Sequence, residues 1–96
     1  DCARFVVEAG YSSQVNREIL NAGLGRDVSV NELAALVEPN LLKIRHVPHI
    51  HPQSEIMKLL CDSRKAKELL GWTPAVGLEE GLALTRAWIK KNPELV

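Results

Sequence analysis

Glycine and proline divide this sequence into short stretches, and that division limits the length of every helix and strand. The breaks fall at Gly10, Gly23, Gly25, Pro39, Pro48, Pro52, Gly71, Pro74 and Pro93. Glycine is favoured just past the end of a helix, and proline cannot continue one. We therefore expect a fold assembled from short elements.

The first half of the sequence predicts two helices. Cys2, Phe5, Val6 and Ala9 follow helical spacing up to Gly10, so the chain opens with a helix. Residues 29–32 read Ser-Val-Asn-Glu, the capping-box pattern in which serine and glutamate each bind the other's free backbone amide. A second helix should start there and stop before Pro39, because proline disfavours helical geometry in the preceding residue.

The second half predicts two more helices. We expect the third to begin with Asp62 as its N-cap, to bury Ala66, Leu69 and Leu70, and to end at Gly71. The fourth should run from about residue 78 to residue 91, with acidic residues at its first turn and lysines at its last. Two tryptophans sit beside these helices and are expected in or at the edge of the core: Trp72 and Trp88.

Short apolar runs between the helices predict strands. Residues 18–22 form an extended segment that ends in a glycine turn, and residues 41–47 could form another strand. The run at residues 56–61 is too short for periodicity to assign. The expected fold is a small helix-rich α/β (α+β) lobe, one domain over residues 1–96, with about four helices and two or three short strands.

Composition excludes several classes of protein. The 96 residues carry 12 basic and 12 acidic side chains, and this balance argues against a nucleic-acid binder or a polybasic membrane-surface protein. No apolar run reaches the roughly 20 residues that a bilayer requires. Two cysteines, Cys2 and Cys61, are too few for a disulfide scaffold, so a reducing cytoplasm is the expected location. The single methionine is Met57, and we expect the chain to be part of a longer product.

All three histidines fall in one polar segment, residues 45–55, which reads Arg-His-Val-Pro-His-Ile-His-Pro-Gln-Ser-Glu. In an extended segment His49 and His51 share a face and could bind a metal with Glu55 or Cys61. The segment could instead offer donors to phosphate or sugar hydroxyls, or serve as a solvated connector. The metal interpretation is the weakest, because the spacing matches no established zinc pattern.

Catalytic motifs are missing from the sequence. It contains no Gly-x-Gly-x-x-Gly, no P-loop, no Gly-x-Ser-x-Gly and no His-Glu-x-x-His. The residues alone therefore predict no reaction.

Several motifs together resemble the C-terminal, substrate-binding part of the NAD-dependent epimerase/dehydratase family, the extended short-chain dehydrogenases/reductases that act on nucleotide sugars. The motifs read Leu-Asn-Ala-Gly-Leu-Gly at 20–25, Val-Ser-Val-Asn-Glu-Leu-Ala at 28–34, Asp-Ser-Arg-Lys-Ala-Lys-Glu-Leu-Leu-Gly-Trp-Thr-Pro at 62–74 and Leu-Glu-Glu-Gly-Leu at 78–82, followed by Trp88. Their order, covering nearly the whole chain, is more specific than any one of them.

The resemblance implies an enzyme whose catalytic parts lie elsewhere. Family members hold NAD in an N-terminal Rossmann domain and use a Tyr-x-x-x-Lys pair; here that domain is absent, and Tyr11 is followed four residues later by Val15. The implied role is the substrate-binding C-terminal fragment of a nucleotide-sugar epimerase or 4,6-dehydratase, an isomerase or lyase. The fragment has no catalytic residue, metal or cofactor of its own, while NAD is implied for the parent.

The resemblance also implies a binding site. The family places an Arg-Pro-Gly-Asp-like segment before the Asp-x-x-Lys-Ala helix, where it contacts the substrate diphosphate. The matching residues 51–55 read His-Pro-Gln-Ser-Glu, so histidine stands in place of arginine and one residue is inserted. His51, Gln53 and Glu55 are the expected contacts to the nucleotide sugar, with Arg45 and His49 behind them.

A second interpretation is a free-standing, noncatalytic domain left from a truncated gene, which binds a ligand or a protein. Loss of a Rossmann neighbour would expose apolar surface, so this domain would be expected to form a homodimer. A metal-binding module built on His46, His49 and His51 is a third interpretation. None of these interpretations involves a nucleic acid or a membrane.

Overall fold

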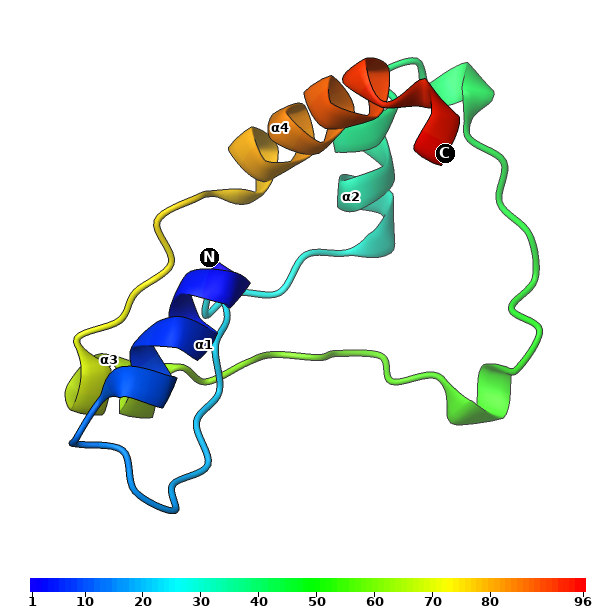
Figure 1. Ribbon diagram of the computed structural model, residues 1–96. Coiled ribbons are helices and arrows are strands. Elements are labelled where there is room, and N and C mark those ends of the chain that lie inside the picture. Colours follow the sequence, from blue (N-terminus) through cyan, green and yellow to red (C-terminus); the bar gives the residue numbers. More distant parts are fainter. The chain divides into compact units, whose positions relative to one another are not determined.

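The computed structural model describes residues 1–96, and it contains four α-helices and three short 3-10 helices (Figure 1). In chain order they are α1 (Cys2–Tyr11), α2 (Val30–Val37), η1 (Leu41–Lys43), η2 (Pro52–Ser54), α3 (Arg64–Leu70), α4 (Leu78–Lys91) and η3 (Pro93–Leu95). The contacts divide the chain into two units, one of residues 1–27 with 60–77 and the other of residues 28–59 with 78–96. The four predicted α-helices are confirmed. None of them is long and apolar enough to cross a lipid bilayer.

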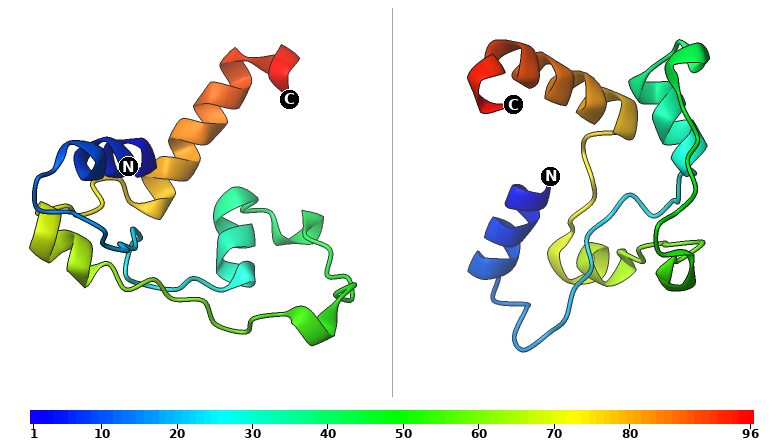
Figure 2. Two further views of the ribbon diagram at one scale, coloured as in Figure 1. Left: turned by 60° about the horizontal axis from the view of Figure 1, so that its bottom comes forward. Right: turned by 90° about the vertical axis from the view of Figure 1, so that its right-hand side faces the viewer.

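The first unit is built around Trp72, which is only 2% exposed. Its ring meets Phe5 of α1 edge to face, with 5.2 Å between ring centroids. Ala66 of α3 is completely buried in the same unit. Gly71 takes the left-handed conformation with φ 64° and ends α3, which turns the chain so that Trp72 can fold back under the helix. Figure 2 shows α1 beside α3 in both views.

Polar contacts fasten the start of α1 to the segment after α3. The Asp1 carboxylate accepts hydrogen bonds from the backbone amides of Ala75 and Val76, the shortest at 2.9 Å. The Arg4 guanidinium donates to the Thr73 carbonyl at 2.6 Å and lies 5.5 Å from the centroid of the Trp72 ring. Helix α1 is therefore held at its first turn by both backbone and aromatic contacts.

The long segment between α1 and α2 is fixed in the first unit at Gly23. The Ser63 hydroxyl donates a hydrogen bond to the Gly23 carbonyl at 3.2 Å. A Cβ atom at position 23 would lie 2.7 Å from the Cβ atom of Cys61, which is too close for any side chain. Five residues before Gly23, Glu18 forms an ion pair with Lys65 of α3.

In the second unit α2 contacts α4 (Figure 1). The predicted capping box is confirmed: the Ser29 hydroxyl accepts from the Glu32 amide at 3.1 Å, and the Glu32 carboxylate accepts from the Ser29 amide at 2.8 Å. At the other end of α2, Arg86 of α4 donates a hydrogen bond to the Val37 carbonyl. The two helices are thus joined by a polar contact where they meet.

The prediction of two or three strands is wrong, because none of the 96 residues forms a strand. Residues 18–22 have no regular structure, and the segment at 41–47 opens with η1 before it becomes extended. A strand requires a neighbour that satisfies its backbone groups, and neither segment finds one within this chain. The fold is helix-rich without a sheet.

Other local predictions also need correction. Ser63, not Asp62, is the N-cap of α3, because the Asp62 carboxylate is occupied by Arg64. Helix α1 continues one residue past Gly10 to Tyr11. Trp88 is 51% exposed and does not lie in a core. Leu69 and Leu70 are only half-buried.

Candidate functional site

The predicted binding segment, residues 45–55, belongs to the second unit, and all of its residues are exposed. It follows η1, which is fixed by the Asn40 side chain accepting a hydrogen bond from the Leu42 amide at 3.2 Å. Lys43 forms an exposed ion pair with Glu38 at 3.7 Å. From Ile44 onward the backbone is extended, in keeping with the two prolines of the segment.

A compact turn forms at residues 49–54, the loop we call the histidine turn. The His51 amide donates a hydrogen bond to the Nδ1 atom of the His49 ring at 2.9 Å. The His51 carbonyl accepts from the Ser54 amide and from the Ser54 hydroxyl, both at 3.1 Å. Both backbone groups of His51 are therefore satisfied inside the turn, and its imidazole faces solvent.

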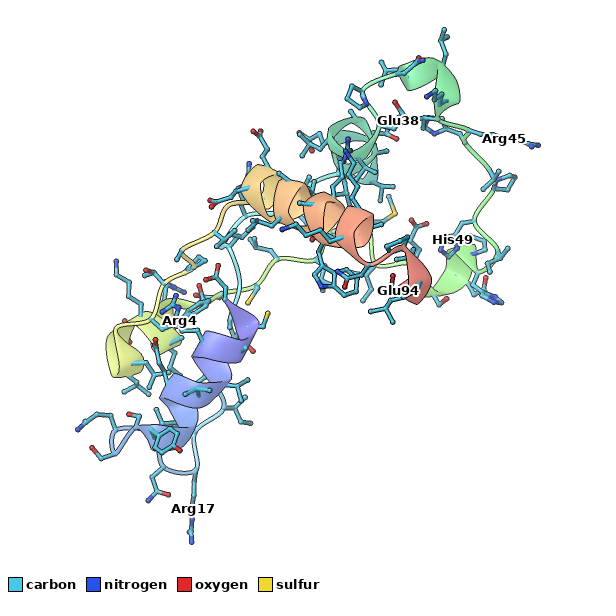
Figure 3. All side chains as sticks on the ribbon, turned by 45° about the horizontal axis from the view of Figure 1, so that its top comes forward. Arg4, Arg17, Glu38, Arg45, His49 and Glu94 are labelled. Atoms are coloured by element: carbon cyan, nitrogen blue, oxygen red, sulfur yellow. The ribbon has the colours of Figure 1, made fainter.

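The structure brings only part of the predicted site together. His49 and His51 share the histidine turn, and Gln53 lies within η2 at its centre. Glu55 closes η2 through its amide, 3.4 Å from the Pro52 carbonyl, and its side chain is exposed. Arg45 lies several residues earlier, and Figure 3 shows its side chain pointing outward from the chain, away from His49. Arg45 and the turn do not form one pocket here.

Sequence reasoning missed a hollow of about 420 Å³ between α2 and the segment that follows it. Its lining is mostly apolar and consists of Asn31, Glu32, Ala34, Ala35, Leu41, Ile44 and His46. Two adjacent alanines leave space on this side of α2, and His46 forms part of the wall. The paired alanines in the middle of α2 are the signal that could have indicated it.

The structure does not support the interpretation that the segment binds a metal. No three histidine, cysteine, aspartate or glutamate side chains gather closely enough to hold an ion. The Nδ1 atom of His49 is already an acceptor within the histidine turn, so only its Nε2 atom is open to a ligand.

The Asp-x-x-Lys-Ala segment serves the first unit. The Arg64 side chain donates to the Asp62 carboxylate at 2.6 Å, and this hydrogen bond, with another from the Arg64 amide, lowers the pKa of Asp62 to about 2. The same contact raises the pKa of Arg64. Lys65 pairs with Glu18, and Ala66 is buried. Asp62, Arg64 and Lys65 line an open hollow of about 540 Å³ together with Asn21 and Glu68.

Comparison with known proteins finds relatives that are sugar-nucleotide epimerases. It is 35% identical over 82 residues to the UDP-glucuronate 4-epimerase of Thermodesulfobacterium geofontis and 40% identical over 81 residues to the GDP-mannose 3,5-epimerase of Arabidopsis thaliana. The chain is related to the NAD-dependent epimerase/dehydratase family. The resemblance seen in the sequence motifs is confirmed, although no family model matches the chain.

A solved structure is also similar to this chain. The X-ray structure of Pal from Bacillus thuringiensis is 57% identical and superposes with a TM-score of 0.88 over 94% of this chain. This epimerase-related chain spans 29% of the Pal chain, 25% of the bacterial epimerase and 21% of the plant epimerase. The relationship therefore concerns about a quarter of each relative.

The residues present do not fit NAD. A Rossmann site needs a strand, a glycine-rich turn and a helix whose N-terminus meets the diphosphate. The 96 residues contain no strand and no glycine fingerprint before any helix. No chemistry of NAD is therefore assigned to these side chains.

Proposed function

We propose that these residues are the substrate-holding part of a nucleotide-sugar epimerase or 4,6-dehydratase, and that catalysis depends on a separate NAD-binding domain of the same protein. The observation that supports this most strongly is the 34–40% identity to UDP- and GDP-sugar epimerases, together with the motif order. Residues 1–96 would then act as one lobe, and the enzyme would be an isomerase or a lyase of the cytoplasm.

In this proposal the histidine turn meets the diphosphate of the substrate. His51 and Gln53 are exposed donors on a short, hydrogen-bonded turn, and phosphate oxygens are strong acceptors for such groups. Glu55 would accept from a ribose or sugar hydroxyl, since a carboxylate next to phosphate is repelled. Arg45 and His49 would lie behind these three contact residues.

Turnover by the native-length protein tests the proposal. Protein purified from its own host is incubated with NAD and with UDP-glucose, UDP-glucuronate or GDP-mannose, and the anomeric protons of the sugar are followed by NMR. We expect one of these sugars to change, and we expect residues 1–96 alone to change none. Failure of the native-length protein to act on any of them, with NAD supplied, would contradict the proposal.

A paired substitution tests the histidine turn. His51→Ala with Gln53→Ala should raise KM about tenfold with little change in kcat, because the lost contacts bind substrate and transition state alike. Arg17→Ala is the matched control: it removes an exposed charge from the other unit and should leave KM unchanged. Equal effects of the two changes would argue against a diphosphate site in the turn.

A second function has one observation in its favour: very little of the chain buries itself. Only Ala66 and Trp72 are buried, while large apolar side chains such as Leu84 and Trp88 are about half exposed. A free-standing domain of this kind would cover its apolar surface by forming a homodimer and would bind a ligand or a protein without catalysis. Sedimentation of the native product distinguishes this function from the substrate-holding part of an enzyme. A small self-associating species favours the free-standing domain.

A further inference from the structure

The histidine turn contains a hydrogen bond that depends on protonation. The His49 ring accepts from the His51 amide through Nδ1, at 2.9 Å. A ring nitrogen accepts only while it carries no proton, and in the imidazolium form both nitrogens are donors. The contact therefore exists with neutral His49 and is lost when His49 becomes cationic.

The rest of the turn depends on the same residue. His51 begins η2, and its carbonyl accepts both hydrogen bonds from Ser54. The bond from its amide to His49 is what connects η2 to the extended segment before it. When that bond breaks, His49 no longer holds the His51 backbone, and the orientation of the His51 ring is less restricted.

Few other groups influence His49. Its side chain is exposed, and its ring accepts a hydrogen bond from the His51 amide. The charged or titratable groups of the same segment are Arg45, His46, His51 and Glu55. Figure 3 shows Arg45 turned away from His49. Measurements at pH 8 and pH 5 lie on either side of the range in which imidazole side chains ordinarily change charge.

We propose that neutral His49 is a positioning residue that holds the histidine turn ready for a nucleoside diphosphate, and that its protonation releases the turn. The inference rests on the proposed function for the identity of the ligand. It gives His49, which lies behind the expected contact residues, a defined role as the support for His51. The proposed effect of acid is opposite to that of charge attraction. Protonated histidines would by themselves bind an anionic ligand more tightly.

The hydrogen bond is tested without any ligand. In the native-length protein, NMR should show the His51 amide protected from exchange at pH 8 and losing that protection by pH 5. In His49→Asn the amide should stay protected at both pH values, because an asparagine oxygen accepts from the amide two residues on and does not titrate. In His49→Ala it should be unprotected at both.

The same measurement on His51→Gln excludes a direct effect of the His51 ring. The side chain of residue 51 cannot be protonated in that variant, but His49 is still present. Protection of the residue 51 amide should therefore still fall with acid. An amide that exchanges equally fast in the wild type, His49→Asn and His49→Ala at pH 8 would overturn the proposed hydrogen bond.

Binding of UDP then tests the consequence. The affinity of the wild type relative to His49→Asn should fall by about fivefold or more between pH 8 and pH 5, a coupling within the usual range. A constant ratio, with UDP bound by both proteins, would overturn the positioning role and leave the proposed function in place. Absence of UDP binding to every variant, with the amide behaving as expected, would overturn the proposed ligand and retain the switch.

Discussion

Gly23 is a residue that cannot carry a side chain in this fold. A Cβ atom there would lie 2.7 Å from the Cβ atom and 2.9 Å from the Sγ atom of Cys61. The two positions cannot separate freely, because the Ser63 hydroxyl holds the Gly23 carbonyl. The glycine is therefore required by the close approach of another segment.

Gly23→Ala should destabilise the protein by about 1–3 kcal/mol, the usual cost of overpacking a well-packed contact. Urea denaturation of the native-length protein measures this. Gly10→Ala is the matched control, because nothing lies within 4 Å of a Cβ atom at position 10 and alanine favours the helix. If the two substitutions change the free energy of unfolding equally, Gly23 and Cys61 do not approach each other closely.

Asp62 gives a prediction about pH. The hydrogen bonds from Arg64 lower its pKa from 3.8 to about 2. A group with a lowered folded pKa contributes stability above its unfolded pKa and loses it as pH falls through the folded value. The contribution should thus be complete above about pH 4 and lost as the pH falls toward 2.

The NMR titration of the Asp62 carboxyl carbon tests this directly. We expect its midpoint near pH 2, and we expect it to return toward 3.8 in Arg64→Met, which removes the side-chain donor and keeps the backbone amide. Arg64→Met leaves the Lys65–Glu18 ion pair in place, so a change in the midpoint reports on the Arg64 contact alone. A midpoint that does not differ between the two proteins would show that Arg64 does not hold Asp62.

At the scale of elements, the contact between α1 and the end of α3 depends on the shape of arginine. Arg4 combines a hydrogen bond to the Thr73 carbonyl with stacking near the Trp72 ring. Lysine can supply the charge but not the planar fork that makes both contacts. The guanidinium is partly exposed, so its contribution is moderated by solvent.

Arg4→Lys should therefore destabilise the first unit by about 1 kcal/mol, nearly as much as Arg4→Ala. Thermal unfolding followed by tryptophan fluorescence reports on it, because Trp72 lies in this unit. Glu8→Gln removes only the ion pair that Glu8 forms with Arg4 at 3.0 Å, and it should cost a few tenths of a kcal/mol. Full stability in Arg4→Lys would mean that charge alone matters.

The helices could be predicted from the sequence because their signals are local. The capping box at Ser29, the left-handed Gly71 and the bounds of α4 each depend on a few adjacent residues. The absence of strands could not be predicted, because a strand forms only where a partner strand pairs with it. The two expected segments find no such partner in these 96 residues. The prediction that Asp62 is the N-cap of α3 is wrong because the Arg64 side chain binds the Asp62 carboxylate, and adjacent residue types alone do not reveal this contact.

The candidate site was predicted only in part for a similar reason. The sequence located the polar segment and its histidines, and the structure joins His49 to His51 in one turn. It did not indicate that Arg45 points away or that His46 lines a separate hollow beside α2. Side-chain direction in an extended segment depends on its neighbours, and spacing alone does not determine it.

At the scale of the whole molecule, the main feature is how little surface is covered. A chain of this length can bury roughly 60% of its unfolded surface, yet only Ala66 and Trp72 are buried here. Apolar side chains remain open on both units, among them Val6 of α1 and Leu84 of α4. Such surface is typical of a part that packs against further protein.

The most direct test of the account is the intact mass of the product in its native host, isolated with an antibody against residues 1–96 and measured by mass spectrometry. We expect a product of about 35 kDa, the size of an NAD-binding domain joined to this lobe. A product of 10.6 kDa would contradict it and would leave the free-standing binding domain as the explanation.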